Sequence, residues 1–441
     1  MPKKASKSVS TKGHVKAARK TATAAAAGKT LRIPITNVFD GNDYSAQILI
    51  GSNKVPANVI LDTGSSTLAV VPSVYDAAKD PAMTPTTLAQ QVQYGTGAWL
   101  GPVVNTSLQI GDPDGDTVTL PSAPIAITVV QSQDDFTGVD GIMGLAYLSL
   151  NSAYDMKGYL TAQKIKPPVT YPWPFPSSNL AQSWKQFTQL TNGAGVSQTS
   201  IDPYFDDLES KGLTMNKFAF YTLRSWVRMA TTNQTAISLD PWNNGFFILG
   251  GGEEQTDLYT GSFVNVDVTD DVYYNTNLIS IQVDGCPVVA AKPLQPEYKG
   301  AGSNCIVDTG TNPLVLSNDV FQAIMQSLEK LNPQFVNIIR HAQSDGISSS
   351  MLNLAKWPGI SFTLTGDTGS PVKLTCSPQT YWQEDYPQPG YSVFQIEAAG
   401  TKNPVNQSIL GLPLMNNYFT VFDRSQGAGN GIIRFAPIVL P

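Results

Sequence analysis

The chain has 441 residues, enough for two or three domains at roughly 150 residues each. Only 14% of the residues are charged, and the 36 glycines and 31 prolines favour a turn-rich β protein over a helical one. The net charge is −6, but the first 32 residues hold nine Lys or Arg and no acid, so the rest carries −15. An acidic body argues against nucleic acid as a partner. The absence of an 18-residue apolar run argues against a membrane span.

The basic start of the chain, residues 1 to 30, lacks the apolar core of a secretory signal. Its composition favours a solvated, disordered tail. A short inhibitory pro-segment lying on the acidic body is a second interpretation, and an organelle-targeting or nucleic-acid arm is a third. With neither signal nor membrane span, an intracellular location is the default expectation.

The first chemically distinctive stretch is "NVILDTGSSTLAVVPS", residues 58 to 73. Asp62 stands there between an apolar pair and an apolar run, where an isolated charge is costly. Its carboxyl group should therefore be paired, neutralised or functional. The tripeptide Asp-Thr-Gly recurs in "CIVDTGTN" at Asp308 and in "LTGDTGSP" at Asp367.

The first two copies share a context that the third lacks. Each follows an apolar pair, continues with a hydroxyl residue (Ser65 or Thr311) and leads into an apolar run, which predicts strand, turn and strand. Asp367 instead lies between Gly and Ser-Pro, which is typical of an exposed hairpin turn. Asp62 and Asp308 are thus predicted to occupy equivalent turns in two similar lobes.

Two such turns facing each other across a pseudo-two-fold axis would bring the two carboxyl groups together. Like charges about 3 Å apart do not both ionise readily, so the pair would share a proton, one member acting as acid and the other as base. Such a pair can hold and activate a water molecule. Gly64 and Gly310 would let the backbone come close, and the hydroxyls of Ser65 and Thr311 could bond the outer carboxylate oxygens.

Helical patterns are few, and the best are residues 179 to 190 and 317 to 331. A Ser-His-Asp mechanism would rest on His341 alone, without a G-x-S-x-G partner. The three cysteines lack zinc-ligand spacing, so we expect one disulfide and one buried thiol. Cys286 and Cys305 could close a hairpin leading into the second Asp-Thr-Gly.

Several landmarks in chain order resemble the pepsin-like aspartic endopeptidases over about residues 31 to 441. Besides the two Asp-Thr-Gly turns, they are a flap-like hairpin, the apolar-apolar-Gly segments that thread beneath each Asp loop, and the crossing between the lobes. These are "VQYGTGAWLG" (92 to 101), "VDGIMGLAY" (139 to 147), "SILGLPLMNNYFTVFDR" (408 to 424) and "FFILGGGEEQTDLYTGSF" (246 to 263).

The resemblance implies an all-β, bilobed fold with a central cleft, an N-terminal lobe over residues 31 to 252 and a C-terminal lobe over 253 to 441. It implies hydrolysis of polypeptide substrates by water activated between Asp62 and Asp308, without a covalent intermediate, metal or cofactor. A monomer is expected. The other implied site residues brace the loops, form the flap or line substrate subsites. They are Thr63, Gly64, Ser65, Thr309, Gly310 and Thr311 beside the pair, Tyr94, Gly95, Thr96 and Trp99 in the flap, Ile60, Val139 and Ile142 around an apolar specificity pocket, and Asn312 in a substrate subsite.

Departures from the family pattern concern specificity and the flap. Asn312 replaces the usual Ser in a subsite, and Ala69 stands where a Trp commonly bonds the flap Tyr, so the flap looks more like that of the memapsin branch. Tyr94 and Trp99 bracket a four-residue loop, so we expect a cross-strand pair with Trp99 Nε1 donating to Tyr94 Oη. Simple packing of the two aromatics is the alternative.

The largest departure is an insertion at about residues 149 to 200, containing "PPVTYPWPFPSS" (167 to 178). Alternating prolines and aromatics favour polyproline II with the rings displayed outward. An extra surface loop packed on the N-terminal lobe is the first interpretation, and a wall extending the substrate cleft is the second.

A catalytically inactive binding or inhibitor module on the same fold is the alternative function. Retention of both Asp, both Gly, both hydroxyls and the flap Tyr argues against it. The sequence favours the endopeptidase.

Overall fold

The computed structural model describes residues 29–39, 43–94, 97–112, 114–132, 136, 138–177, 179–342, 346–400, 405–427 and 429–441. The predicted basic tail falls outside these ranges except for its last two residues. Gly95 and Thr96, at the tip of the predicted flap, also fall outside. In the part that is described, no helix is long and apolar enough to cross a membrane.

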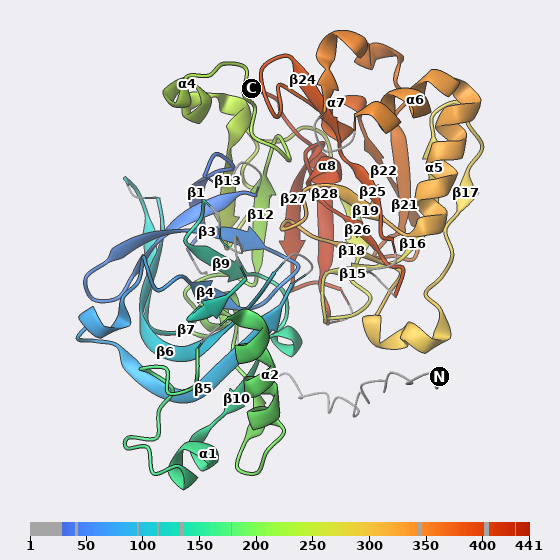
Figure 1. Ribbon diagram of the computed structural model, residues 1–441. Coiled ribbons are helices and arrows are strands. Elements are labelled where there is room, and N and C mark those ends of the chain that lie inside the picture. The colour runs from blue at the N-terminus through green and yellow to red at the C-terminus, as the bar shows by residue number, and fades with distance from the viewer. Residues whose placement is uncertain are drawn as a thin grey trace.

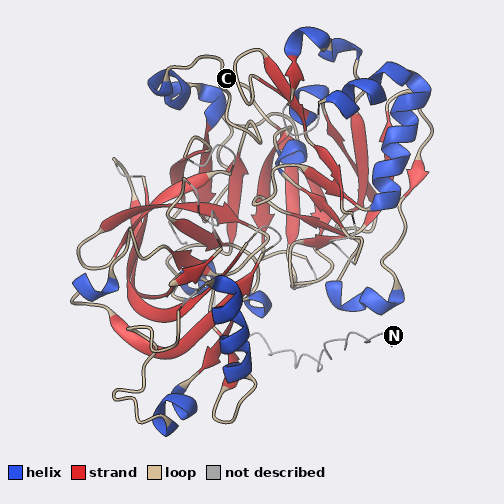
Figure 2. Ribbon diagram, viewed as in Figure 1, coloured by secondary structure: helices blue, strands red, loops and turns tan. Residues whose placement is uncertain are grey.

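The molecule consists of two mostly β lobes that lie side by side (Figures 1 and 2), which confirms the predicted bilobed β fold. The first lobe is drawn from blue to green and the second from yellow to red in Figure 1. The strands and helices up to the crossing are β1 (Leu31–Thr36), β2 (Ser45–Ile50), β3 (Val55–Asp62), β4 (Leu68–Val70), η1 (Ala77–Lys79), β5 (Thr84–Gln93), β6 (Ala98–Gly111), β7 (Thr117–Ile127), β8 (Val130–Gln131), β9 (Gly141–Gly144), η2 (Leu148–Leu150), β10 (Ser152–Asp155), α1 (Lys157–Ala162), α2 (Leu180–Thr191), β11 (Ser197–Ser200), α3 (Tyr204–Ser210), β12 (Lys217–Tyr221), α4 (Gln234–Leu239), η3 (Pro241–Asn243) and β13 (Asn244–Leu249).

The elements after the crossing build the second lobe, with α5 and α6 along its outer side (Figure 1). They are β14 (Val264–Asp267), β15 (Asn275–Thr276), β16 (Leu278–Val283), β17 (Val289–Ala290), η4 (Pro296–Ala301), β18 (Cys305–Val307), β19 (Leu314–Leu316), α5 (Asn318–Leu331), α6 (Pro333–His341), β20 (Ile347–Ser348), η5 (Ser349–Met351), η6 (Leu354–Lys356), β21 (Ile360–Thr365), β22 (Pro371–Cys376), α7 (Pro378–Tyr381), β23 (Trp382–Glu384), β24 (Tyr391–Phe394), β25 (Ile396–Ala398), β26 (Ser408–Leu410), α8 (Leu412–Met415), β27 (Tyr418–Asp423) and β28 (Ile432–Pro437). The predicted helices at 179 to 190 and 317 to 331 are confirmed as α2 and α5.

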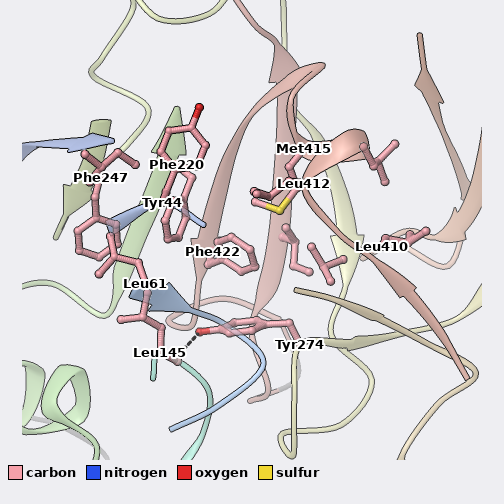
Figure 3. Packing of buried hydrophobic residues seen from close by; sticks show 14 of the residues in the cluster. Tyr44, Leu61, Leu145, Phe220, Phe247, Tyr274, Leu410, Leu412, Met415 and Phe422 are labelled. Atoms are coloured by element: carbon pink, nitrogen blue, oxygen red, sulfur yellow. Dashed lines mark hydrogen bonds between the residues drawn. The ribbon is translucent and has the colours of Figure 1, made fainter. Parts of the chain in front are cut away.

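A shared sheet joins the lobes, because β1, β13, β12, β27, β28 and β14 pair in that order, each antiparallel to the next. One face of this sheet buries aromatic rings, and Phe218 stacks on Phe422 with ring centroids 5.1 Å apart. Figure 3 shows Phe422 near Tyr274, whose hydroxyl donates a 3.0 Å hydrogen bond to the carbonyl oxygen of Leu145. The aromatic core therefore fixes the end of one lobe against the other.

The two lobes repeat one strand arrangement around the two Asp motifs. In the first lobe β3 runs parallel to β9, β9 antiparallel to β4, and β4 parallel to β7. In the second lobe β18 runs parallel to β26, β26 antiparallel to β19, and β19 parallel to β25. The equivalence predicted from the repeated tripeptide is thus present in the strand topology.

Asp367 lies in the turn between β21 and β22, exposed to solvent, as its Gly and Ser-Pro neighbours predict. Its Oδ2 accepts a 2.8 Å hydrogen bond from Asn265 Nδ2. The third copy of the tripeptide is therefore a turn residue.

The predicted disulfide is wrong, because Cys286 and Cys305 are buried free thiols. Cys286 follows β16, which belongs to a four-stranded sheet with β17, β21 and β22. Its Sγ lies 3.5 Å from the carbonyl oxygen of Ser327 on α5. Cys305 begins β18 in a different, five-stranded sheet, so the hairpin that would have joined the two thiols does not form.

The insertion forms β10, α1, α2 and β11 on the first lobe, and its aromatic rings face inward rather than outward as predicted. Phe175 is buried, and its ring lies 5.5 Å from that of Phe187 on α2. Trp173 packs on both rings at 4.8 and 5.6 Å. An apolar face of α2 is available to cover these rings, and burying them outweighs the extended, solvated arrangement.

Candidate active site

Asp62 ends β3 and Asp308 follows β18, so both carboxyl groups come at the ends of equivalent buried strands. Each residue is 7% exposed. The backbone N–H of Gly64 donates to Asp62 Oδ1 at 2.7 Å, and that of Gly310 donates to Asp308 Oδ1 at 2.9 Å. Each turn therefore holds one oxygen of its own carboxyl group.

Thr63 and Thr309 lock the two turns together across the lobe boundary. The backbone N–H of each donates to the Oγ1 of the other, both at 2.9 Å. The hydroxyl of Thr63 donates to the carbonyl oxygen of Val307 at 3.2 Å, and that of Thr309 to Leu61 at 2.7 Å. These four bonds are buried, so losing one partner would leave unsatisfied groups on both lobes.

The glycines of the two motifs leave the space that each opposite carboxyl group occupies. A Cβ atom on Gly64 would lie 2.6 Å from Asp308 Oδ2, and a Cβ atom on Gly310 would overlap Asp62 Oδ1. Each carboxyl group thus sits against the other loop's glycine. The reason for glycine here is the close approach, since neither residue is among those with positive φ.

Burial raises the pKa of the Asp62 carboxyl well above its usual range, and the neighbouring charge of Asp308 raises it further. The hydroxyl of Ser65 and the N–H of Gly64 oppose this rise without cancelling it. Asp62 therefore keeps its proton at a pH at which an exposed carboxyl group has lost it.

The supporting hydroxyls differ between the two sides. Thr311 Oγ1 donates to Asp308 Oδ2 at 2.7 Å. Ser65 Oγ is buried and makes no hydrogen bond of standard geometry within the described residues, although it is near enough to lower the pKa of Asp62. Ser65 and Thr311 thus occupy equivalent positions in the two loops, as predicted, but only Thr311 makes the expected hydrogen bond among the described residues.

Ile60, Val139 and Ile142 belong to one buried apolar cluster, which we call the flap cluster because Tyr94 and Trp99 pack in it. Ile60 points here rather than into the main core because Ala57, Val59 and Leu61 alternate with it along β3 and face the main core. The structure thus brings together three residues predicted to line the specificity pocket.

The predicted flap hydrogen bond is present: Trp99 Nε1 donates to Tyr94 Oη at 3.3 Å. The predicted strand register is wrong, because Trp99 pairs with Val92 and the N–H of Tyr94 bonds the carbonyl oxygen of Gly97 at 2.7 Å. The loop is two residues long rather than four. Tyr94 and Trp99 are therefore diagonal neighbours on one face of the hairpin, still within reach for aromatic side chains.

The residues that depart from the family pattern lie near the site or beneath it. Ala69 is fully buried and pairs with Ile142, so the flap cluster fills the space beside it. Asn312 follows Thr311, and its Oδ1 is buried without a hydrogen bond among the described residues.

Tyr273 is a neighbour of the pair that the sequence did not indicate. Burial raises its pKa, and the charges of Asp308 and Asp62 add to the rise. Adjacent Tyr274 is fully buried in the core instead. Nothing in the "DVYYNTN" segment separates these two tyrosines, so only the fold reveals which one the charges of the two carboxyl groups reach.

Most of the chain matches a known protein family. A family model described as "Eukaryotic aspartyl protease" matches residues 43–169 and 198–437. The chain belongs to this family. The match leaves out residues 170–197, which lie inside the predicted insertion and include α2.

Curated relatives are similar to this family member over nearly its whole length. Cathepsin E of Aquarana catesbeiana is 26% identical over 428 residues, covering 93% of this chain and 83% of the relative. Pepsin A of Sus scrofa is 25% identical over 421 residues, covering 92% and 83%. Chymosin of Callithrix jacchus is 24% identical over 407 residues, covering 89% and 80%.

Proposed function

We propose that this aspartyl protease is an active endopeptidase in which Asp62 and Asp308 activate a water molecule. The observation that supports this most is the pairing of the two carboxyl groups, each held by its own turn and set against the opposite glycine. Two buried carboxyl groups that share one proton provide an acid and a base at the same pH.

The chemistry needs this pair, one water molecule and the substrate. The ionised carboxylate takes a proton from water as the water oxygen attacks the carbonyl carbon of the peptide, while the protonated carboxyl group donates its proton to the carbonyl oxygen. Collapse of the tetrahedral intermediate breaks the C–N bond and protonates the leaving amine. No enzyme–substrate covalent bond forms.

The preference we propose is for apolar side chains flanking the scissile bond. Ile60, Val139 and Ile142 supply an apolar surface beside the Asp62 loop. Asn312, next to Thr311, would face another subsite. We also propose that the flap follows the memapsin branch, since Trp99 bonds the flap tyrosine where Ala69 cannot.

The organisation we propose is a monomer with lobes at residues 31 to 252 and 253 to 441. The basic residues 1 to 30 would be a solvated tail or a short pro-segment held by the acidic body. In the second case a chain starting at residue 29 would show higher activity near neutral pH than the full chain, whereas a solvated tail gives equal activities.

The decisive experiment is digestion of an acid-denatured protein between pH 3 and 7, with and without pepstatin, analysed by mass spectrometry of the products. Pepstatin-sensitive cleavage beside apolar residues supports the endopeptidase. A folded protein that cleaves nothing at any pH would support the inactive binding module on the same fold.

A further inference from the structure

A buried polar link connects the Asp62 loop to the flap hairpin. Asn151 Oδ1 accepts a 3.0 Å hydrogen bond from Thr67 Oγ1 and a 2.8 Å hydrogen bond from Gln90 Nε2. Thr67, Asn151 and Gln90 are 4%, 3% and 2% exposed. One oxygen thus satisfies two buried donors that come from different parts of the lobe.

The three residues occupy positions that matter for the site. Thr67 lies five residues after Asp62, in the same loop, and its carbonyl oxygen accepts from the N–H of Gly144 beneath that loop. Gln90 lies on β5, the outer flap strand, and also donates to the carbonyl oxygen of Ser152 at 3.1 Å. Asn151 directly precedes β10, the first strand of the insertion.

The insertion holds β5 along its outer edge as well. Strand β10 pairs with β5 at Ala89 and Leu88, which covers an edge that would otherwise be open. The residue after Gln90 also contacts the insertion: Gln91 Nε2 donates to Thr188 Oγ1 at 2.9 Å and to the carbonyl oxygen of Trp184 at 3.2 Å, both on α2. Helix α2 is part of the segment that the family model leaves out, so this support belongs to the chain's own insertion.

We propose that Asn151 and Gln90 are positioning residues that fix the flap hairpin relative to the Asp62 loop, with the insertion as the flap's support. The expected effect on catalysis rests on the proposed function. The expected effect on the order of the flap rests on the polar link alone. A flap already fixed in place does not have to be ordered when substrate binds. If the link is broken, only a fraction of molecules is competent to bind, and the apparent affinity falls by that fraction.

The first test replaces Gln90 by methionine, which has a similar shape and no donor. We expect hydrogen exchange of the amides of residues 92–94 and 97–100 to rise about tenfold, the population shift typical when a buried group loses its hydrogen-bond partner. Amides of β27 should be unchanged. The matched control is Gln198→Met, on the exposed strand β11, which should leave flap exchange as in the wild type.

The kinetic test uses a peptide identified from the digestion products. Gln90→Met should raise KM by the factor by which the binding-competent fraction falls, at most about tenfold, and leave kcat within about twofold, because bound substrate restores the flap. Asn151→Leu should do the same, since it removes the shared acceptor. Loss of active molecules through general instability would instead lower kcat and leave KM unchanged.

Gln90→Glu gives the most specific test, because its hydrogen bond to Asn151 Oδ1 can form only when the introduced carboxyl group is protonated. The introduced side chain cannot donate to Asn151 Oδ1 as a carboxylate, whereas its protonated acid form can. Flap exchange and KM should therefore approach wild-type values in acid and depart from them as pH rises. Gln90→Met should show its defect at every pH.

The outcomes separate the two proposals. Faster flap exchange in Gln90→Met and Asn151→Leu, in a wild type that cleaves nothing, would support the positioning link and overturn the endopeptidase. Unchanged flap exchange in both folded variants would overturn the positioning link whatever the activity.

Discussion

The two Asp loops differ less in structure than in what surrounds them. Both follow a buried strand, both hold one carboxyl oxygen by a glycine N–H, and the two threonines bond each other reciprocally. Yet, within the described residues, Thr311 donates to Asp308 while Ser65 makes no bond of standard geometry. The flap hairpin and the insertion belong to the first lobe. The repeated frame thus brings two carboxyl groups together in unequal surroundings.

The largest expected effect comes from removing either carboxyl group. Asp62→Asn and Asp308→Asn should each lower kcat by about 10²- to 10⁴-fold, the range expected for loss of acid–base catalysis. Asp367→Asn, in the same tripeptide but in an exposed turn, should retain wild-type kcat. Equal losses in all three variants would refute the division into two site copies and one turn copy.

Filling the space beside each carboxyl group tests the symmetry of the frame. Gly64→Ala and Gly310→Ala would each push the opposite carboxyl group from its place, and a displacement of about 1 Å can cost about 10²-fold in rate. We expect similar losses from the two variants. Gly300→Ala, in η4, has no neighbour within 4 Å of the added atom and no positive φ, and is the control for kcat. A variant with full activity would show that the glycine is not needed for close approach.

Two buried carboxyl groups of the first lobe should respond to pH in opposite directions. The pKa of Asp62 is raised, so its contribution to stability is present in acid and is lost as pH rises through the raised value. Asp62→Asn should therefore raise Tm at pH 7 and leave it nearly unchanged at pH 3. A Tm that falls at pH 7 would contradict this sign.

Asp80 is the contrasting case. Burial alone would raise its pKa, but hydrogen bonds from Thr106, Tyr75 and Ser52 outweigh burial and hold the pKa below its usual range. Its stabilising contribution is thus present above the ordinary Asp pKa and is lost only as pH falls through the lowered value. Asp80→Asn should cost about 1 to 3 kcal/mol at pH 7 and less in strong acid, as measured by denaturant unfolding.

The difference between the two supporting hydroxyls gives a smaller effect. Thr311→Val removes a 2.7 Å bond to Asp308 and should lower kcat/KM about tenfold. Ser65→Ala removes no standard bond and should cost no more than about threefold. Because the hydroxyl of Ser65 lowers the pKa of Asp62, Ser65→Ala should also move the Asp62-dependent limb of the pH profile to higher pH. A larger loss of kcat/KM in Ser65→Ala than in Thr311→Val would show that Ser65, and not Thr311, supports its carboxyl group more strongly.

The strands and turns around the two Asp motifs could be predicted from the sequence, because they depend on local residue patterns. Apolar pairs before Asp62 and Asp308 predict strand and turn, and the periodic apolar residues of α2 and α5 predict helices. The insertion packs on the first lobe as first interpreted. The orientation of its rings was predicted wrongly because the Pro-aromatic repeat indicates backbone conformation but not the surface on which the rings dock, and Phe175 docks on Phe187 of α2.

Features that depend on contacts between residues far apart along the chain, or on the strand register, could not be predicted from the sequence. The flap register depends on which residues close the loop, and a two-residue loop places Trp99 opposite Val92 instead of Tyr94. The link through Asn151 joins residues that are 61 and 84 positions from it along the chain. Such contacts carry no periodic signal.

The smallest effect concerns the flap hydrogen bond, which belongs to the first lobe alone. Tyr94→Phe removes the acceptor, and Trp99→Phe removes the donor, so each should lower kcat/KM by a similar factor of about three to five, as expected for one neutral hydrogen bond. Trp99 is fully buried in the flap cluster, so its replacement by a smaller ring should also cost about 1 to 2 kcal/mol of unfolding free energy, whereas Tyr94→Phe should cost less. The double variant then discriminates: if the bond matters, the two kinetic losses will not add. Additive kinetic losses would mean that the two aromatics only pack, and that the flap depends on their volume rather than on the indole N–H.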